Sequence, residues 1–344
     1  MKFDELFSKS WGEYKNGFKT FFKIMFTLYF IPAIIVFILS SLLAFNLFGS
    51  MVPVQEDFGI AQISSELILF SGGEIILSII NFIFMIWMIA SLVYYSIYNK
   101  DKMNFKTSIV GGEKYFWKYF GYGILLMLFI FLLLIVPIII SMPFILAGFT
   151  NQGYAILGVL LMLVLFIIAI ILLIKYMVLW VFGGYVLVGE NKGVIESFKI
   201  SSKMVRGRWW SVFGYMILLG LIFFAISMCF GIISSMISLI FTIPYMVGGF
   251  SEALVAGGEV NMQIPLTISL ISGFIQQIIG FITNLIIIPL GILFVKNFYL
   301  DFKKGKAFVQ EGFLKKNSAN VVKPVKKKVS VKKTGSKNTT SKKR

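Results

Sequence analysis

Long uncharged hydrophobic runs alternate with short polar segments along the chain. A helix needs about 20 apolar residues to cross the ~30 Å hydrocarbon core of a bilayer. The runs that reach this length are 24–48, 75–98, 119–149, 154–174, 211–243 and 266–295. Backbone polar groups inside lipid must be satisfied within the segment, so runs of this length are predicted to be helices. The expected fold is an all-α integral membrane protein whose six transmembrane helices occupy residues 24–300.

The positions of the basic residues predict the orientation of these helices. Apart from Lys175, all Lys and Arg residues fall in the segments 1–23, 99–118, 188–210 and 296–344. The loops 49–74, 150–153 and 244–265 contain no Lys or Arg, and the first and third of them contain acidic residues. Short cytoplasmic loops retain Lys and Arg. We therefore expect a multi-pass protein of the cell membrane with both termini cytoplasmic (N-in, C-in).

The formal net charge of +17 comes from these basic segments. A basic cytoplasmic face attracts anionic lipid headgroups, and each nearby Lys or Arg contributes about 1 kcal/mol. The charge either only enforces the orientation or forms a dedicated surface for lipids or a protein partner.

The cytoplasmic segments that precede the first, third and fifth spans align as copies of one unit. A serine follows a phenylalanine by three positions in each copy: Phe7 and Ser10, Phe105 and Ser108, Phe198 and Ser201. Weak internal symmetry of this size is common in membrane folds. The pattern predicts three pseudo-repeated units, each an interfacial helix followed by a transmembrane hairpin.

Two of these segments have helical amphipathic periodicity. In 1–23, and again in Ile195–Trp209, apolar residues recur at steps of three and four with basic residues between them. The apolar stripe predicted for the first segment is Phe3, Phe7, Trp11, Tyr14, Phe18 and Phe21. This pattern is typical of helices that lie in the headgroup region. The candidate membrane and lipid contacts are Trp11, Lys15, Lys199, Lys203, Arg206, Arg208, Trp209 and Trp210. The alternative is a short anchoring helix that only sets the depth and tilt of its span.

Polar residues within the spans form a second candidate site. Its members are Lys175, Gln276, Gln277, Thr283 and Asn284. Lys175 falls close to the cytoplasmic interface, where a lysine can extend its ammonium group to the headgroups. The alternative places it in a polar cavity that contacts an anion or substrate. The amides and hydroxyls of the sixth span either hydrogen-bond to neighbouring helices or line a solute path.

Glycine and proline suggest where helices bend or end. The Gly-Gly-Glu triplets at 72–74, 111–113 and 257–259 are interpreted as turns that lead into a helix. Prolines in or beside the spans are expected to kink or end them. These are Pro32, Pro137, Pro143, Pro244 and Pro289.

The chain lacks the residues that several kinds of catalytic site require. The chain has no histidine and a single cysteine, Cys229. This excludes Ser-His and Cys-His catalysis and histidine-containing zinc sites. The apolar runs contain no carboxylate, and the chain contains no phosphate-binding GxxxxGK[ST] sequence. We expect no enzymatic activity, no metal and no cofactor.

Residues 301–344 form a basic tail. From Lys323 onward the tail is rich in Lys and has no acidic residue, so it is predicted to be disordered. It is a candidate contact for anionic lipid or a protein partner, and no specific nucleic-acid recognition is expected.

Residues 186–223 carry a family resemblance. Glu190 precedes an amphipathic segment with Ser201, and the basic-Gly-basic-aromatic run 206–209 leads into a span. This stretch resembles the membrane domain found N-terminal to some glycerophosphodiester phosphodiesterases, and its stand-alone six-span relatives in bacteria and archaea. In those enzymes the catalytic residues belong to a separate soluble barrel, which this chain lacks. The resemblance implies a membrane module without phosphodiesterase activity and a role near lipids.

The sequence thus favours a non-enzymatic polytopic membrane protein that binds or organises lipids or protein partners. The alternatives are a passive transporter or channel and a membrane subunit of a transport complex.

Overall fold

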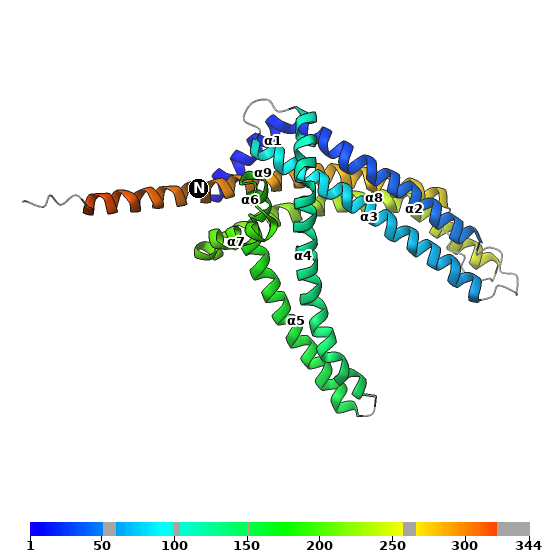
Figure 1. The fold of residues 1–344 in the computed structure, drawn as a ribbon. Coiled ribbons are helices and arrows are strands. Elements are labelled where there is room, and N and C mark those ends of the chain that lie inside the picture. The colour runs from blue at the N-terminus through cyan, green and yellow to red at the C-terminus, as the bar shows by residue number, and fades with distance from the viewer. Residues whose placement is uncertain (51–59, 99–103, 150, 257–265, 322–344) are drawn as a thin grey trace, which may run out of the picture. The chain divides into compact units, whose positions relative to one another are not determined.

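A computed structural model describes residues 1–50, 60–98, 104–149, 151–256 and 266–321, which are almost entirely helical (Figure 1). The elements are α1 (Phe3–Met25), the π-helix η1 (Phe26–Phe30), α2 (Ile31–Ser50), α3 (Ile60–Tyr98), α4 (Phe105–Ala147), α5 (Gln152–Trp180), α6 (Gly183–Gly189), α7 (Val194–Val205), the 3-10 helix η2 (Arg206–Arg208), α8 (Trp209–Ala256) and α9 (Leu266–Val321). No strand occurs among the described residues.

Within the described residues, six helical stretches are long and apolar enough to cross a membrane. They are Phe3–Ala44, Phe70–Tyr98, Phe105–Ala147, Gln152–Gly189, Val194–Pro244 and Leu270–Lys304. Each overlaps one of the runs identified in the sequence, so the prediction of six apolar spanning helices is confirmed. The N-in, C-in orientation stays a prediction.

The chain divides into two compact units, Met1–Asp301 and Phe302–Arg344. All contacts discussed below lie within the first unit. In the second, α9 is helical as far as Val321, and the remainder of the predicted disordered tail lies outside the described residues.

The first amphipathic segment, α1, packs one face against the protein. The buried residues of α1 follow helical steps of three and four: Leu6, Ser10, Tyr14, Gly17, Phe21 and Ile24. Trp11 and Phe18, predicted to share a single apolar stripe with Tyr14, are exposed instead. The π-helix η1 lies directly before Pro32, which has no N–H to continue the α-helical ladder. The helix axis changes direction there (Figure 1).

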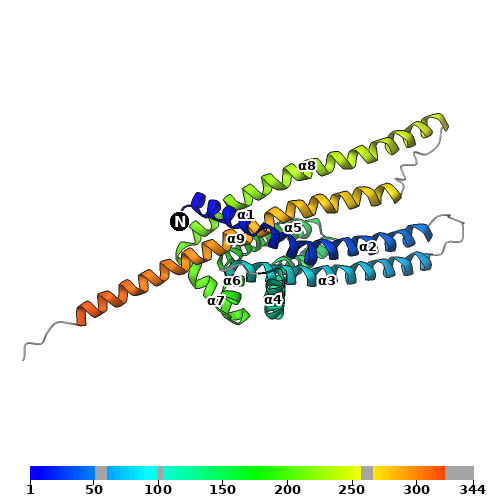
Figure 2. The same ribbon diagram turned by 90° about the horizontal axis from the view of Figure 1, so that it is seen from above.

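A hydrophobic core joins α1, η1, α3 and α9. Its buried side chains include Phe21 and Met25 of the N-terminal helix, Leu92 of α3, and Leu285 and Leu293 of α9. Around this core α2 pairs with α3, which lie side by side in Figures 1 and 2, and α4 pairs with α5 as a hairpin. Where these helices lie in lipid, close van der Waals packing rather than transfer out of water holds such side chains together.

The short helix α6 is enclosed by tyrosines. Hydroxyl groups donate to carbonyl oxygens at and around it in four pairs: Tyr98 to Val188, Tyr119 to Gly184, Tyr122 to Trp180 and Tyr185 to Ile292. A Cβ at Gly183 or Gly184 would lie 2.7 Å or 2.6 Å from the nearest atom of Tyr122 or Tyr119, so both rings require glycine there. One of these acceptors, Val188, is among the last four carbonyls of α6, which lack a partner within the helix.

The interpretation of the Gly-Gly-Glu triplets as turns is wrong for the first two. Residues 72–74 lie inside α3 and residues 111–113 lie inside α4. Gly111 and Gly112 instead allow α4 to approach Tyr94 and Ser91 of α3. The third triplet lies outside the described residues.

Candidate functional site

A groove opens where the end of α5 meets α7, η2 and the start of α8. Its volume is about 820 Å³. The residues that line it are Ile171, Ile174, Lys175, Tyr176, Leu179, Ser202, Arg206, Trp209 and Trp210. We call it the cationic groove. It combines residues from both predicted sites: Lys175 came from the intramembrane set, and Arg206, Trp209 and Trp210 came from the interfacial set.

A break in the helix after α5 positions the groove. α5 ends at Trp180 and α6 begins at Gly183. The fully buried Ser201 of α7 spans this break, because its hydroxyl donates to the Leu179 carbonyl at 2.7 Å and accepts from the Phe182 N–H at 3.2 Å. Ser201 therefore holds α7 against the end of α5.

A second contact fixes α8 beside α5. The indole Nε1 of Trp209 donates to the backbone carbonyl of Lys175 at 3.3 Å. The ring of Trp209 also stacks on Phe213, with centroids 4.8 Å apart. Trp209 thus lies at the groove wall with one end bonded and its apolar body packed, as is usual for a tryptophan at a polar–apolar boundary.

Two cations line the groove. Lys175 and Arg206 are both exposed, and neither forms an ion pair among the described residues. The Lys175 ammonium lies 5.9 Å from the centroid of the Tyr176 ring, where the ring quadrupole attracts it. The groove therefore has positive charge that no carboxylate neutralises through an ion pair in the described part of the chain.

The remaining wall of the groove is largely apolar. Ile171 and Ile174 follow each other on α5 and continue away from Lys175 toward the middle of that predicted span. Trp210, which is 76% exposed, forms the other wall. The groove thus combines two cations with aliphatic and aromatic side chains.

The other predicted interfacial residues lie outside this groove. Lys199, Lys203 and Arg208 are exposed on α7 and η2. Trp11 and Lys15 are together on α1, with the Lys15 ammonium 5.6 Å from the Trp11 ring centroid. The exposed pair of Lys192 and Glu196 caps the start of α7, and the Glu196 carboxylate raises the pKa of Lys192 above its ordinary value.

The polar residues of the sixth span do not join Lys175. Gln276 is exposed and Gln277 is half-buried on α9. The hydroxyl of Thr283 donates to the carbonyl of Ile279 on its own helix. Asn284 donates to the Tyr29 hydroxyl of η1 at 2.8 Å. Thr283 and Asn284 therefore use their hydrogen bonds for helix structure and packing.

The sequence pattern missed a buried polar cluster between α1 and α9. The Lys296 Nζ and Glu13 Oε2 atoms are 2.5 Å apart, and the Asn297 side chain donates to Glu13 and to Ser10. The sequence signal for this cluster was the spacing of three positions between Ser10 and Glu13, which places both residues on one face of α1. Within the described ranges no three acidic or cysteine side chains converge, so this part of the structure offers no metal site.

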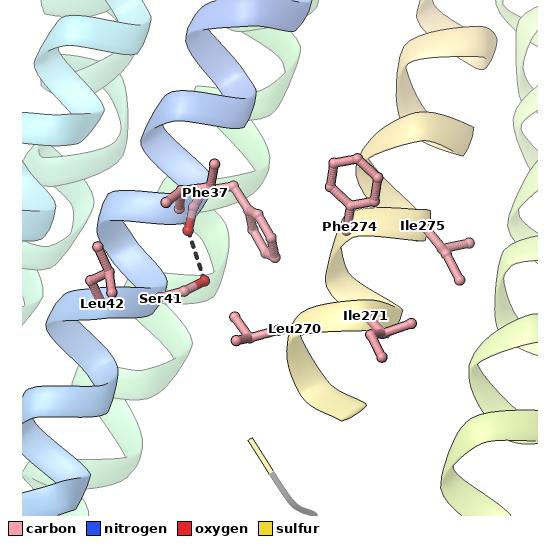
Figure 3. Close-up of a pocket in the computed structure, with 8 residues that line it drawn as sticks. Phe37, Ser41, Leu42, Leu270, Ile271, Phe274 and Ile275 are labelled. Atoms are coloured by element: carbon pink, nitrogen blue, oxygen red, sulfur yellow. Dashed lines mark hydrogen bonds between the residues drawn. The ribbon is translucent and has the colours of Figure 1, made fainter. Parts of the chain in front are cut away.

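An apolar hollow of about 560 Å³ lies between α2 and α9. Figure 3 shows Phe37 and Leu42 of α2 on one side and Leu270, Phe274 and other α9 residues on the other. Its polar group, the Ser41 hydroxyl, donates to the carbonyl of Phe37. The hollow can therefore accept an apolar chain but offers nothing to distinguish one headgroup from another.

Most of the spanning region matches a known protein family. Residues 106–299, more than half of the chain, match the model of a domain of unknown function, DUF7847. The chain belongs to the DUF7847 family. The matched range includes every residue of the cationic groove and extends from α4 to α9. No curated protein and no solved structure matches the chain.

Proposed function

We propose that this DUF7847 protein is a non-enzymatic membrane protein that binds anionic phospholipids in the cationic groove. The single observation that carries the proposal is the juxtaposition of Lys175, Arg206, Trp209 and Trp210 around one partly apolar hollow. Because the two cations lack a carboxylate partner among the described residues, an anion can bind there without displacing an existing ion pair.

The chemistry of the groove suits a phosphodiester with an attached acyl chain. A guanidinium group presents several N–H donors in a fixed plane and pairs well with phosphate oxygens, and Lys adds a point charge. Tryptophan is enriched at the depth of lipid headgroups. An acyl chain would continue along Ile171 and Ile174, where contact is apolar.

The predicted topology supports this assignment. With both termini cytoplasmic, the loop that carries Lys192 and the groove cations would face the inner leaflet, whose anionic lipids attract Lys and Arg. The predicted threefold organisation is supported by the complete burial of Ser10, Ser108 and Ser201. The resemblance of residues 186–223 to the membrane domain of glycerophosphodiester phosphodiesterases adds weight to a role near lipids.

The alternatives from the sequence receive less support. A passive solute path would use Gln276, Thr283 and Lys175 together, but Lys175 lines a groove to which no residue of α9 contributes. Binding of a protein partner by the basic tail, and a place in a larger transport complex, stay predictions.

Native mass spectrometry tests the proposal. The full chain is released from nanodiscs that contain equal amounts of phosphatidylglycerol and phosphatidylcholine, and the retained lipids are identified. We expect retained phosphatidylglycerol in the wild type and roughly 25-fold weaker retention in Lys175→Gln/Arg206→Gln, from about 1 kcal/mol for each lost cation. The matched control Lys106→Gln/Lys114→Gln removes the same charge from exposed positions on α4.

The result that would overturn the proposal is equal retention of the two lipids by the wild type. An equal loss of phosphatidylglycerol in the groove variant and in the α4 control would also overturn it, because binding would then follow net charge alone.

A further inference from the structure

A second hollow, of about 490 Å³, lies between α1, α8 and α9. The residues that line it are Phe7, Trp11, Ala225, Ile226, Cys229, Phe230, Ile286 and Leu290. We call it the α8–α9 hollow. It shares no lining residue with the cationic groove, so occupancy of the two can be distinguished.

The walls of the α8–α9 hollow are apolar. On α8, Ala225 and Cys229 are one helical turn apart, and so are Ile286 and Leu290 on α9. Facing rows of this kind leave an elongated space along both helices. No charged side chain lines the hollow itself. Its contents must therefore be apolar, and the spanning positions of α8 and α9 make an acyl chain the available material.

A cation lies at the α1 side of the hollow. The Lys15 ammonium lies 5.6 Å from the centroid of the Trp11 ring, and Trp11 lines the hollow. Lys15 is exposed and forms no ion pair within the described ranges. The positive charge of Lys15 is complementary to a negatively charged lipid headgroup whose acyl chain enters the hollow from the α1 side.

The α1 wall is anchored where this charge lies. The hydroxyl of Tyr14, which precedes Lys15, donates to the Leu285 carbonyl at 3.2 Å, and Leu285 precedes the lining residue Ile286. Tyr14 is 6% exposed. The Lys15 backbone is therefore held at a fixed place beside the hollow. The apolar hollow between α2 and α9 in Figure 3 likewise has no charged lining residue.

We propose that the α8–α9 hollow binds an acyl chain of a second anionic phospholipid, whose headgroup phosphate pairs with Lys15. The site is separate from the cationic groove and does not depend on it. The aromatic body of Trp11 separates the chain from the headgroup, as indole rings do at the bilayer interface.

Photo-crosslinking tests this site. The full chain is placed in phosphatidylcholine nanodiscs with a small fraction of phosphatidylglycerol that carries a diazirine on its acyl chain, and crosslinked peptides are mapped after illumination. We expect crosslinks in 225–230 and 286–290, in addition to those at 171–175 that the proposed function predicts for the cationic groove. Unlabelled phosphatidylglycerol should compete them away, and phosphatidylcholine should not.

Two variants give the proposal its controls. Lys15→Gln should weaken competition by phosphatidylglycerol about fivefold, the factor expected for one cation near the headgroups, whereas the exposed Lys106→Gln should not. Ala225→Trp fills the hollow and should remove crosslinks from 225–230 while leaving those at 171–175 in the cationic groove. If Ala225→Trp does not fold, the wild-type competition and Lys15→Gln decide alone.

Crosslinks that occur as often on Ile139 of α4, which is 62% exposed, as on residues 225–230 would overturn the proposal. An unchanged preference for phosphatidylglycerol in Lys15→Gln would overturn the assignment of the headgroup. Loss of crosslinks at 171–175 alone would count against the proposed function and leave this site standing.

Discussion

The Lys296 ammonium and the Glu13 carboxylate pair at 2.5 Å, although 283 positions separate these residues in the chain. The side chain of Lys296 is 8% exposed, so this is an ion pair within the protein between α1 and α9. Asn297 extends the contact to Ser10. The pair therefore ties the N-terminal amphipathic helix to the last spanning helix.

Removing Glu13 should destabilise the protein. In Glu13→Gln the buried Lys296 ammonium loses its counter-charge, and the expected cost is about 3 kcal/mol of unfolding free energy. Thermal unfolding in detergent measures the effect. The control Glu196→Gln breaks the exposed pair with Lys192 and should cost less than about 1 kcal/mol. Equal effects of the two variants would show that the α1–α9 pair contributes no more than a surface pair.

Two Gly→Ala substitutions should have opposite signs. A Cβ at Gly112 would lie 2.7 Å from the Ser91 Cα, so Gly112→Ala must separate α3 from α4, at a cost of about 1–3 kcal/mol. At Gly12 of α1 nothing lies within 4 Å of the added Cβ. Gly12→Ala should therefore stabilise by up to about 1 kcal/mol through helix propensity. A melting temperature that Gly112→Ala leaves unchanged or raises would contradict the described α3–α4 packing.

The predicted orientation can be tested with the chain's single cysteine removed. In a Cys229→Ala background, Gln152→Cys between α4 and α5 should react with a membrane-impermeant maleimide on intact cells. Lys192→Cys between α6 and α7 should react only after permeabilisation, because short loops rich in Lys and Arg stay cytoplasmic. The reverse pattern would contradict the N-in, C-in topology and the inner-leaflet location of the cationic groove.

The helices could be predicted because an apolar run of spanning length has few alternatives to a helix in lipid. Which face of each helix is buried could not be predicted. The stripe predicted on α1 contained Trp11 and Phe18, yet the buried face runs through Ser10 and Gly17. Small and polar residues fit that face because a neighbouring helix packs against it. The spacing of aromatic residues along one segment carries no information about that neighbour.

The cationic groove could likewise be predicted only in part. Its cations and tryptophans were singled out from the sequence, but Lys175 was grouped with Gln276 and Thr283 of the sixth span. Its place beside Arg206 depends on the helix break after Trp180 and on the bonds that Ser201 makes across it. Those are tertiary contacts, so the sequence named the residues of the groove without bringing them together.

The most direct test of the proposed function is an experimental structure of the full chain in nanodiscs that contain phosphatidylglycerol. We predict a lipid phosphate within hydrogen-bond distance of the Lys175 ammonium and the Arg206 guanidinium, with an acyl chain along Ile171 and Ile174. A cationic groove without lipid, or one that holds phosphatidylcholine equally well, would contradict the account.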